Sequence, residues 1–586
     1  MTKKYELKDV KTPQLYEEIF GYDRIPKVTF DNKIIKLKPP KDFWITCTTF
    51  RDGQQARPPY TVEQIVDLYK FEHRLGGPKG VVRQCEFFLY SDKDKKAVEE
   101  CRKLNYQYPE ITGWIRAKKE DFKLVKQLGL KETGILTSAS DYHIFLKLGK
   151  TRKQAMDGYL EVVKAALDER IIPRCHLEDL TRADFYGFVI PFVQELMKLS
   201  RESKIPIKIR ACDTLGYGIP HPQARLPRGI PKMIRGLIEE GGVPSERLEW
   251  HGHNDFHKVL INAVTAWLYG CSAANGTLLG FGERTGNPPI EGLIIEYIAL
   301  KGGFNGVEPT VITEMGDYFK KVLKEPIPKN YPFVGDEFNI TMAGIHADGG
   351  MKDERIYNIF DTRKLLNRPM SVGITDKSGI AGIVYWINTF FGLKEKSALD
   401  KQDPGALKIH QWVTQEYEKG RITGISTQEM LELTKKYLSN LFQSELEGLK
   451  AKAKDLAYEL ILEVVKKPEI VSMDAPKQEG ILQKVADDNP FIKLIYITDS
   501  SGKKITRNIT QQKDIELYRQ KLQEYGDFSD REWFKEVVSK KEVYFSDLYT
   551  SKITGLLCIT VSAPILDKGD SISGVLGIDI KFDDLI

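Results

Sequence analysis

Two histidines separated by a single residue form the strongest chemical signal in the sequence. His251 and His253 lie in the motif HGHND, at the end of a predicted strand. Because strand side chains alternate between faces, both imidazoles point the same way. Two imidazoles on one face at a strand end can bind one divalent metal, although an isolated HxH pair is only modest evidence for such a site.

A carboxylate from a distant part of the chain can complete this set. Asp52 lies in FRDGQQ, directly after the first predicted strand. One carboxylate and two imidazoles leave coordination positions open for substrate oxygens and water, and they suit Zn²⁺, Mn²⁺ or Mg²⁺ acting as a Lewis acid. Arg51 adds a cation able to stabilise an enolate or a carbonyl oxygen. The alternative for RDG is a turn with an incidental salt bridge.

Eight predicted strands must position these groups. Between residues 40 and 303, short β-branched runs alternate with amphipathic helical patterns such as TVEQIVDLYKFEHRL. This rhythm predicts the α/β class and a TIM (β/α)8 barrel, with an open doubly wound sheet as the alternative. The barrel is favoured because polar residues fall at the carboxyl ends of the strands, which a barrel brings to one rim. These residues are Asp52, Glu86, Ser138, His143, Glu178, Thr214, His251 and His253.

The rest of the chain divides into one segment before the barrel and three after it. We expect an N-terminal segment at 1–39, a helical extension contributing to the active site at 304–425, a helical linker at 426–479, and an α+β domain at 480–586. The linker is charged and helix-periodic. The turns DSSG and DKGD separate the strands of the last domain.

Composition narrows the class of protein. The formal charge of +5, from 87 basic and 82 acidic residues, gives no argument for nucleic-acid binding. The seven cysteines include no CxxC pair, which predicts reduced thiols. The sequence shows no signal peptide and no apolar run long enough to span a membrane, so we expect a cytoplasmic protein.

The motifs also resemble a known family. FRDGQQ, HLEDLTR, CDTLGY, HGHND and GERTGN occur in the order typical of the DRE-TIM metallolyase superfamily. The closest branch contains the synthases of isopropylmalate, homocitrate and citramalate, which condense acetyl-CoA with a 2-oxo acid. The strings ITCTTFRDGQQARPPYT, GILTSASDYHIFLKL and NGTLLGFGERTGN most resemble the Re-citrate synthases. The resemblance runs from about residue 4 to 440.

This resemblance implies an acyltransferase that performs a metal-dependent Claisen condensation, with oxaloacetate and acetyl-CoA giving citrate. The alternatives are the three related synthases or an acyl-CoA lyase, although AGIHADGG beyond the barrel argues against a simple lyase. A non-enzymatic signalling protein is a further rival, which the intact motifs argue against. In the family the extension reaches into the partner subunit, so a homodimer is implied.

The resemblance assigns roles to individual residues. The metal, which could be Mn, Mg, Zn or Co, would be held by Asp52, His251, His253 and, more distantly, Asn287. Thr214 would bind the carboxylate of the 2-oxo acid, and Arg51 would polarise its carbonyl. Glu178 would lie near the acetyl group, and the extension would supply a catalytic histidine, His346, with Tyr357 at the spacing of a tyrosine partner. Either Glu178 or His346 would remove the proton of the acetyl group.

Substrate choice is expected to depend on inward-facing residues. Counting back by two from Thr214 and from Glu178 places Arg210, His176 and Arg174 on the inward face. We hypothesise that Arg210, His176 or His143 meets the distal carboxylate of oxaloacetate; the alternative is a buried ion pair low in the barrel. Glu86 is a further substrate-binding candidate, and nothing small follows it, which argues against an isopropylmalate synthase pocket. Cys47 stands where the family usually has Asp, which puts a hydrogen bond near the metal in doubt.

The C-terminal domain resembles a Cache sensor domain, which has a PAS-like fold. Arg531, Trp533, Tyr549 and Asp579 fall where amino-acid-binding Cache domains contact their ligand, although Phe534 replaces a common tyrosine. Arg531 could pair with a carboxylate and Asp579 with an ammonium group. The hypothesis is a small-molecule regulator; the alternative is a degenerate domain kept for packing.

Overall fold

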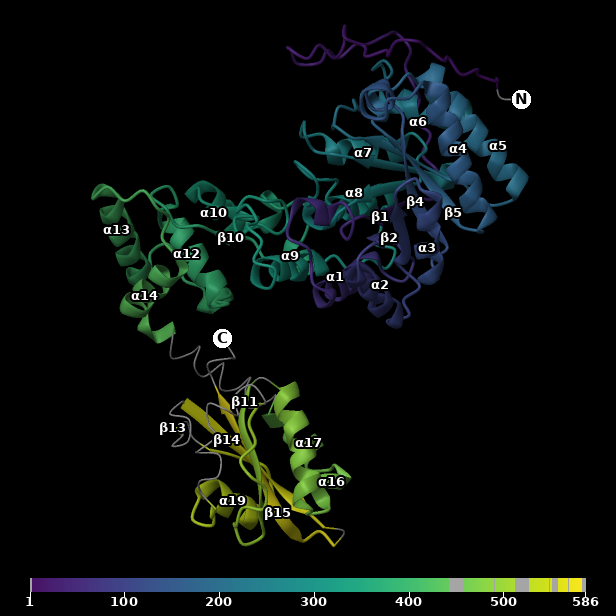
Figure 1. Cartoon of the computed structure of the whole chain (residues 1–586). Helices are drawn as coiled ribbons and strands as arrows, with labels where there is room; N and C mark the ends of the chain where they lie inside the picture. The colour runs from purple at the N-terminus through teal and green to yellow at the C-terminus, as the bar shows by residue number, and fades with distance from the viewer. Residues whose placement is uncertain are drawn as a thin grey trace. The chain divides into compact units, whose positions relative to one another are not determined.

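The chain forms two compact units. The computed structural model describes residues 3–441, 457–458, 460–489, 491–511, 526–546, 549–550, 557–567 and 569–581. The first unit is Met1–Ile340 with Asp353–Met370, and the second is Thr341–Lys352 with Ser371–Ile586. Figure 1 shows helices α1 to α8 around the barrel strands of the first unit.

Eight parallel strands close into a barrel in sequence order, because β1 pairs with β2 on one side and with β8 on the other. This closure confirms the predicted TIM barrel over the open sheet. The strands are β1 (Trp44–Cys47), β2 (Val82–Phe88), β3 (Glu110–Ile115), β4 (Glu132–Ser138), β5 (Ile172–Glu178), β6 (Lys208–Asp213), β7 (Leu248–Gly252) and β8 (Ala273–Gly276).

Amphipathic helices follow the strands and cover the barrel. Several begin at a capping box, such as Thr61 with Gln64 before α1 and Thr151 with Gln154 before α4. Their apolar faces pack on the outer faces of the strands in one core. The helices are α1 (Val62–Gly76), α2 (Asp92–Lys103), α3 (Phe122–Gln127), α4 (Arg152–Asp168), α5 (Ile190–Ser203), α6 (Ile230–Glu239), α7 (Val259–Leu268) and α8 (Ile290–Lys301).

Helices continue after the barrel, as predicted for the extension. The first unit adds α9 (Val311–Lys321) and α11 (Thr362–Leu366). Beyond these lie a pair of short strands, β9 (Ile340–Thr341) and β10 (Ser371–Val372), and the helices α10 (Gly344–Lys352), α12 (Gly379–Phe390), α13 (Pro404–Glu418) and α14 (Thr427–Tyr437). The central part of α12 is apolar and buried, and it packs against α10 and α13.

The C-terminal part is an antiparallel sheet with helices, which confirms the predicted α+β domain. The sheet has the order β11-β15-β14-β12, with β13 also paired to β14. Buried side chains of α17 and α19 belong to two separate apolar clusters of this sheet. The elements are α16 (Pro468–Val471), α17 (Ala475–Asp488), β11 (Ile492–Asp499), α19 (Glu532–Lys540), β12 (Tyr544–Phe545), β13 (Tyr549–Thr550), β14 (Leu557–Leu566) and β15 (Ile572–Lys581).

The linker predicted at 426–479 begins with α14 and includes α16, and residues 442–456 lie outside the described part of the chain. Among the helices that the structure describes, none is long and apolar enough to cross a lipid bilayer.

Candidate active site

Asp52, His251 and His253 meet at the carboxyl end of the barrel. Asp52 Oδ2 lies 3.3 Å from His251 Nε2 and 3.7 Å from His253 Nε2. The three side chains are buried, and one ligand atom from each lies within 4.8 Å of the others. The structure thus brings together the three residues on which the predicted metal site depended.

Electrostatics keeps these groups in the protonation states that a metal requires. Burial would raise the pKa of Asp52, but Arg51 and the two imidazoles lower it to about 2. Burial lowers the pKa of His251 to about 3 and also lowers the pKa of His253. The site therefore offers one carboxylate and two neutral imidazoles, which is a donor set for a divalent cation.

Asn287 supports the same interpretation. Its Nδ2 donates to Asp52 Oδ2 at 3.4 Å and to the carbonyl of Gly252 at 3.1 Å. Within the described residues, its buried Oδ1 and the buried Nδ1 of His253 have no hydrogen-bond partner. A Cβ at Gly282 would lie 1.9 Å from Asn287 Oδ1, so only glycine leaves room for this side chain. Unsatisfied buried polar atoms beside a carboxylate are consistent with a site built for a cation.

Arg51 is held against the edge of this cluster. Its Nε donates to Glu86 Oε1 at 3.0 Å, and its Nη1 lies 3.4 Å from Asp52 Oδ2. The guanidinium also lies over the ring of Trp114, with its central carbon 5.6 Å from the ring centroid. These contacts fix a permanent cation beside the predicted metal ligands.

Glu178 ends β5 and is surrounded by donors. Its carboxylate accepts hydrogen bonds from Ser138 Oγ at 2.5 Å and His143 at 2.9 Å, and from Lys147 Nζ at 3.2 Å. Burial would raise the pKa of Glu178, but His143, Ser138 and Lys147 lower it to about 2. Glu178 is therefore an ionised carboxylate and a weak proton acceptor at neutral pH.

Thr214 contacts the residue that follows Glu178. The backbone amide of Asp179 donates to Thr214 Oγ1 at 2.8 Å, which leaves the hydroxyl hydrogen able to donate elsewhere. Asp179 adopts a left-handed backbone, with φ 62°. Strained residues of this kind gather at functional sites.

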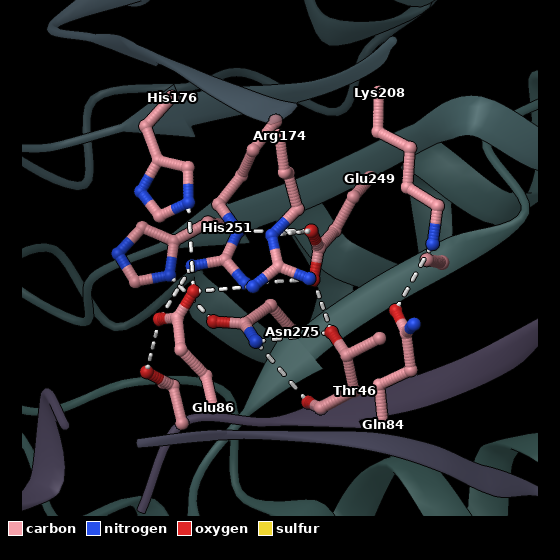
Figure 2. Close-up of polar contacts among 12 residues, drawn as sticks. Thr46, Gln84, Glu86, Arg174, His176, Lys208, Glu249, His251 and Asn275 are labelled. Atoms are coloured by element: carbon pink, nitrogen blue, oxygen red, sulfur yellow. Dashed lines mark hydrogen bonds and ion pairs between the residues drawn. The ribbon is translucent and has the colours of Figure 1, made fainter. Parts of the chain in front are cut away.

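Charged side chains fill the barrel interior below this rim (Figure 2). Arg210 is fully buried; its Nη1 donates to Glu86 at 2.9 Å, and its Nε and Nη2 donate to Glu249 at 2.9 and 3.0 Å. Arg174 donates to Glu86 and Glu132, and His176 Nε2 lies 3.5 Å from Glu86 Oε2. Arg210 thus forms the buried ion pair that the sequence left as the alternative to substrate contact.

Cys47 contacts α1 rather than the predicted metal ligands. Its thiol donates to Glu72 Oε1 of α1 at 2.8 Å, and it accepts a hydrogen bond from the amide of Thr49 at 3.2 Å. The cysteine therefore contributes to the layer between β1 and α1. The hydrogen bond near the metal site, which the sequence put in doubt, is absent among the described contacts of Cys47.

His346 and Tyr357 belong to different units of the chain. His346 lies on α10 of the second unit. Tyr357 lies in the first unit, directly after a short turn of helix at Glu354–Ile356, and it is 44% exposed.

Two of the four proposed sensor residues lie in the buried part of the C-terminal domain. Asp579 Oδ1 accepts hydrogen bonds from Thr560 Oγ1 at 2.8 Å and Tyr496 at 3.3 Å. Trp533 is buried, with its ring centroid 5.8 Å from that of Tyr496. The side chain of Arg531 is 40% exposed, and that of Tyr549 lies outside the described residues.

Comparisons with known proteins agree with this architecture. The family model described as HMGL-like matches residues 43–315. The model described as a methyl-accepting chemotaxis protein-like first PDC sensor domain matches residues 478–586.

Three curated relatives extend the match beyond the barrel. A citrate (Re)-synthase of Syntrophus aciditrophicus is 56% identical over the whole chain and 92% of its own length. A citrate (Re)-synthase of Clostridium kluyveri is 51% identical, covering 75% of this chain and 97% of its own. A 2-phosphinomethylmalate synthase of Streptomyces hygroscopicus is 35% identical, covering 71% of this chain and 95% of its own.

Proposed function

The chain belongs to the Re-citrate synthase family, and we propose on that premise that it condenses acetyl-CoA with oxaloacetate to give citrate and CoA. The enzyme is an acyltransferase of the acetyl-CoA-condensing type. The observation that carries the proposal is the buried cluster of Asp52, His251 and His253 beside the fixed guanidinium of Arg51.

In this proposal Asp52, His251 and His253 hold a divalent metal, with Asn287 completing the site. When bound, the metal would act as a Lewis acid toward the carbonyl and carboxylate oxygens of the 2-oxo acid. A donor set of nitrogen and oxygen suits Mn, Mg, Zn or Co.

The residues of the chain supply the remaining chemistry. Thr214 donates its hydroxyl hydrogen to the carboxylate of the 2-oxo acid. Arg51 stabilises the negative charge that grows on the carbonyl oxygen when the acetyl carbon attacks. The new oxygen is then protonated, and water cleaves the thioester to release CoA.

The acetyl group must first lose a proton from its methyl carbon. With a pKa of about 2, Glu178 is a poor match for this task, because a general base works best when its pKa is near the operating pH. We therefore assign the proton transfer to His346 of AGIHADGG, and we keep Tyr357 as a further candidate catalytic residue. The role left to Glu178 is to orient His143, whose Nδ1 lies 2.9 Å from the carboxylate.

His143 is also the best placed of the three candidates for the distal carboxylate of oxaloacetate. Arg210 and His176 lie within the interior ion network around Glu86. The side chain of His143 is 18% exposed, and it lies on a single π-helical turn, Tyr142–Lys147, above β4. Such turns occur frequently at functional sites.

The direct test is thiol release from acetyl-CoA with a panel of 2-oxo acids. Oxaloacetate is expected to give turnover, and 2-oxoisovalerate, 2-oxoglutarate and pyruvate little or none. Turnover with 2-oxoisovalerate but not oxaloacetate would overturn the substrate assignment.

Product stereochemistry is measured on citrate that the enzyme makes from labelled acetyl-CoA. Cleavage of this citrate by a Si-specific citrate lyase should leave the label in oxaloacetate rather than in acetate.

Two further properties belong to the same proposal. A homodimer is expected from the family, and light scattering of the full chain would measure its mass.

The C-terminal domain is proposed to bind an amino acid or organic acid near Arg531, Trp533, Tyr549 and Asp579. Such a ligand would raise the melting temperature of the full chain. If no compound of a broad metabolite panel changes the melting temperature or the activity of the full chain, the regulatory role is contradicted.

A further inference from the structure

A chain of hydrogen bonds runs through the barrel interior from Glu249 to His251 (Figure 2). The hydroxyl of Thr46 donates to Glu249 Oε1. Asn275 Nδ2 donates to Thr46 Oγ1 at 3.0 Å and to the Thr46 carbonyl at 3.3 Å. Asn275 Oδ1 lies 2.8 Å from His251 Nδ1. The four residues come from β7, β1 and β8, and all are buried.

The direction of every bond follows from Glu249. This carboxylate pairs with Arg210 through two contacts of 2.9 and 3.0 Å, so it is ionised and can only accept hydrogen bonds. Thr46 must then donate its single hydroxyl hydrogen to Glu249. The oxygen of that hydroxyl is left to accept, so the NH₂ group of Asn275 has to face Thr46.

The amide of Asn275 therefore presents its oxygen to His251. An amide oxygen accepts and does not donate, which requires a hydrogen on His251 Nδ1. In a neutral imidazole the lone pair is then on Nε2. Nε2 is the atom that lies 3.3 Å from Asp52 Oδ2.

We propose that Glu249, acting through Thr46 and Asn275, sets the tautomer and the ring orientation of His251 and so presents Nε2 to the metal. This inference rests on the proposed metal centre. Thr46, Asn275 and Glu249 are positioning residues, since they act only through His251. Removal of residues that orient a metal-bound histidine typically weakens metal binding by about 10-fold to 100-fold.

Metal affinity tests the inference without any assay of the loaded enzyme. Mn²⁺ binding to the metal-free full chain is measured by calorimetry or by competition with a chromophoric chelator. We expect Asn275→Leu to weaken binding about 10-fold to 100-fold. Thr46→Val should have a smaller effect in the same direction, because Asn275 keeps its contact with the Thr46 carbonyl.

Two matched variants separate orientation from loss of packing. Thr46→Ser keeps the hydroxyl and should bind Mn²⁺ like the parent. Thr265→Val makes the same chemical change as Thr46→Val on α7, where the hydroxyl donates only to the Ile261 carbonyl, and it should leave binding unchanged. Equal affinities for the parent, Asn275→Leu and Thr46→Val would overturn the inference, whereas a parent that binds no Mn²⁺ would contradict the metal centre itself.

The tautomer can be observed directly, even in a protein that binds no metal. Nitrogen-15 spectra of the metal-free, histidine-labelled chain report which ring nitrogen carries hydrogen, and the signal altered by Asn275→Leu belongs to His251. We expect hydrogen on Nδ1 and a bare Nε2. Hydrogen on Nε2 in the parent would overturn the inference whatever the metal affinity.

Discussion

His253 Nε2 lies 3.7 Å from Asp52 Oδ2, although Asp52 follows β1 and His253 follows β7. This separation is short enough for one ion to contact both atoms once the side chains adjust slightly. Closure of the barrel produces it, because β8, which pairs with β1, also pairs with β7.

The first prediction concerns this pair. Asp52→Asn keeps the size of the side chain and removes its charge. We expect weaker binding of divalent metal and a fall in citrate formation of about 100-fold or more, since Lewis-acid stabilisation is worth several kcal/mol. Metal removal by a chelator should abolish activity in the parent, and Mn²⁺ should restore it. Asp42→Asn, at an aspartate paired with Arg83, is the control and should behave like the parent.

The second prediction tests the geometry of Arg51. Arg51→Lys retains the positive charge but loses the planar guanidinium that contacts Glu86 and Asp52 together. We expect kcat to fall about 100-fold to 1,000-fold, with a small change in KM, because the contact strengthens in the transition state. Steady-state kinetics would check this, with Arg83→Lys, at a half-buried arginine paired with Asp42, as the control. A rise in KM at constant kcat would instead indicate a role in substrate binding alone.

The third prediction concerns His143. Truncation in His143→Ala removes the proposed partner of the distal carboxylate. KM for oxaloacetate should rise about 10-fold or more, the loss expected for a charge-assisted hydrogen bond, while KM for acetyl-CoA changes little. His410→Ala, on α13, provides the comparison. Unchanged discrimination between oxaloacetate and pyruvate in His143→Ala would rule out this assignment.

The fourth prediction is a pH dependence of stability that originates at Glu72. Burial raises the pKa of Glu72 from 4.5 to about 7, against hydrogen bonds from Cys47 and Cys85 that lower it. The native state therefore retains a proton that the unfolded state releases between these pH values. The stabilisation is complete below about pH 4.5 and is lost as pH rises through about 7.

Glu72→Gln cannot ionise and should flatten this dependence. Denaturant unfolding at intervals from pH 5 to 8 would measure it, and the contribution of Glu72 is at most ~3 kcal/mol. Glu99→Gln, at an exposed position on α2, should retain the slope of the parent. An identical slope in Glu72→Gln and the parent would contradict the raised pKa.

Much of the fold was predictable because its signals are local. The alternation of apolar strands with amphipathic helices identified the barrel, and strand periodicity placed His251 and His253 on one face. The order of the motifs identified the family. The same periodicity placed Arg210 and His176 on the inward face, but it could not separate a substrate contact from an internal ion pair.

The residues missed by sequence reasoning were Glu249, Thr46 and Asn275. The sequence did contain a signal for Glu249: it precedes His251 by two positions on β7, so both side chains point to the inward face. Thr46 and Asn275 lie within the quoted motif strings, but a neutral threonine and a neutral asparagine on neighbouring strands gave no sign that they contact each other. Their role depends on the register of β1 against β8, which places Thr46 opposite Asn275.

The sequence by itself determined which residue types could bind a metal and on which strands they lie, because side-chain alternation and motif spacing are properties of a few consecutive residues. Only the tertiary structure decided their partners. The registers of β6, β7, β8 and β1 bring Arg210, Glu249, Asn275 and Thr46 together across the barrel interior. Because these groups are buried away from water, their donors must pair with acceptors inside the barrel, and this requirement determines their contacts.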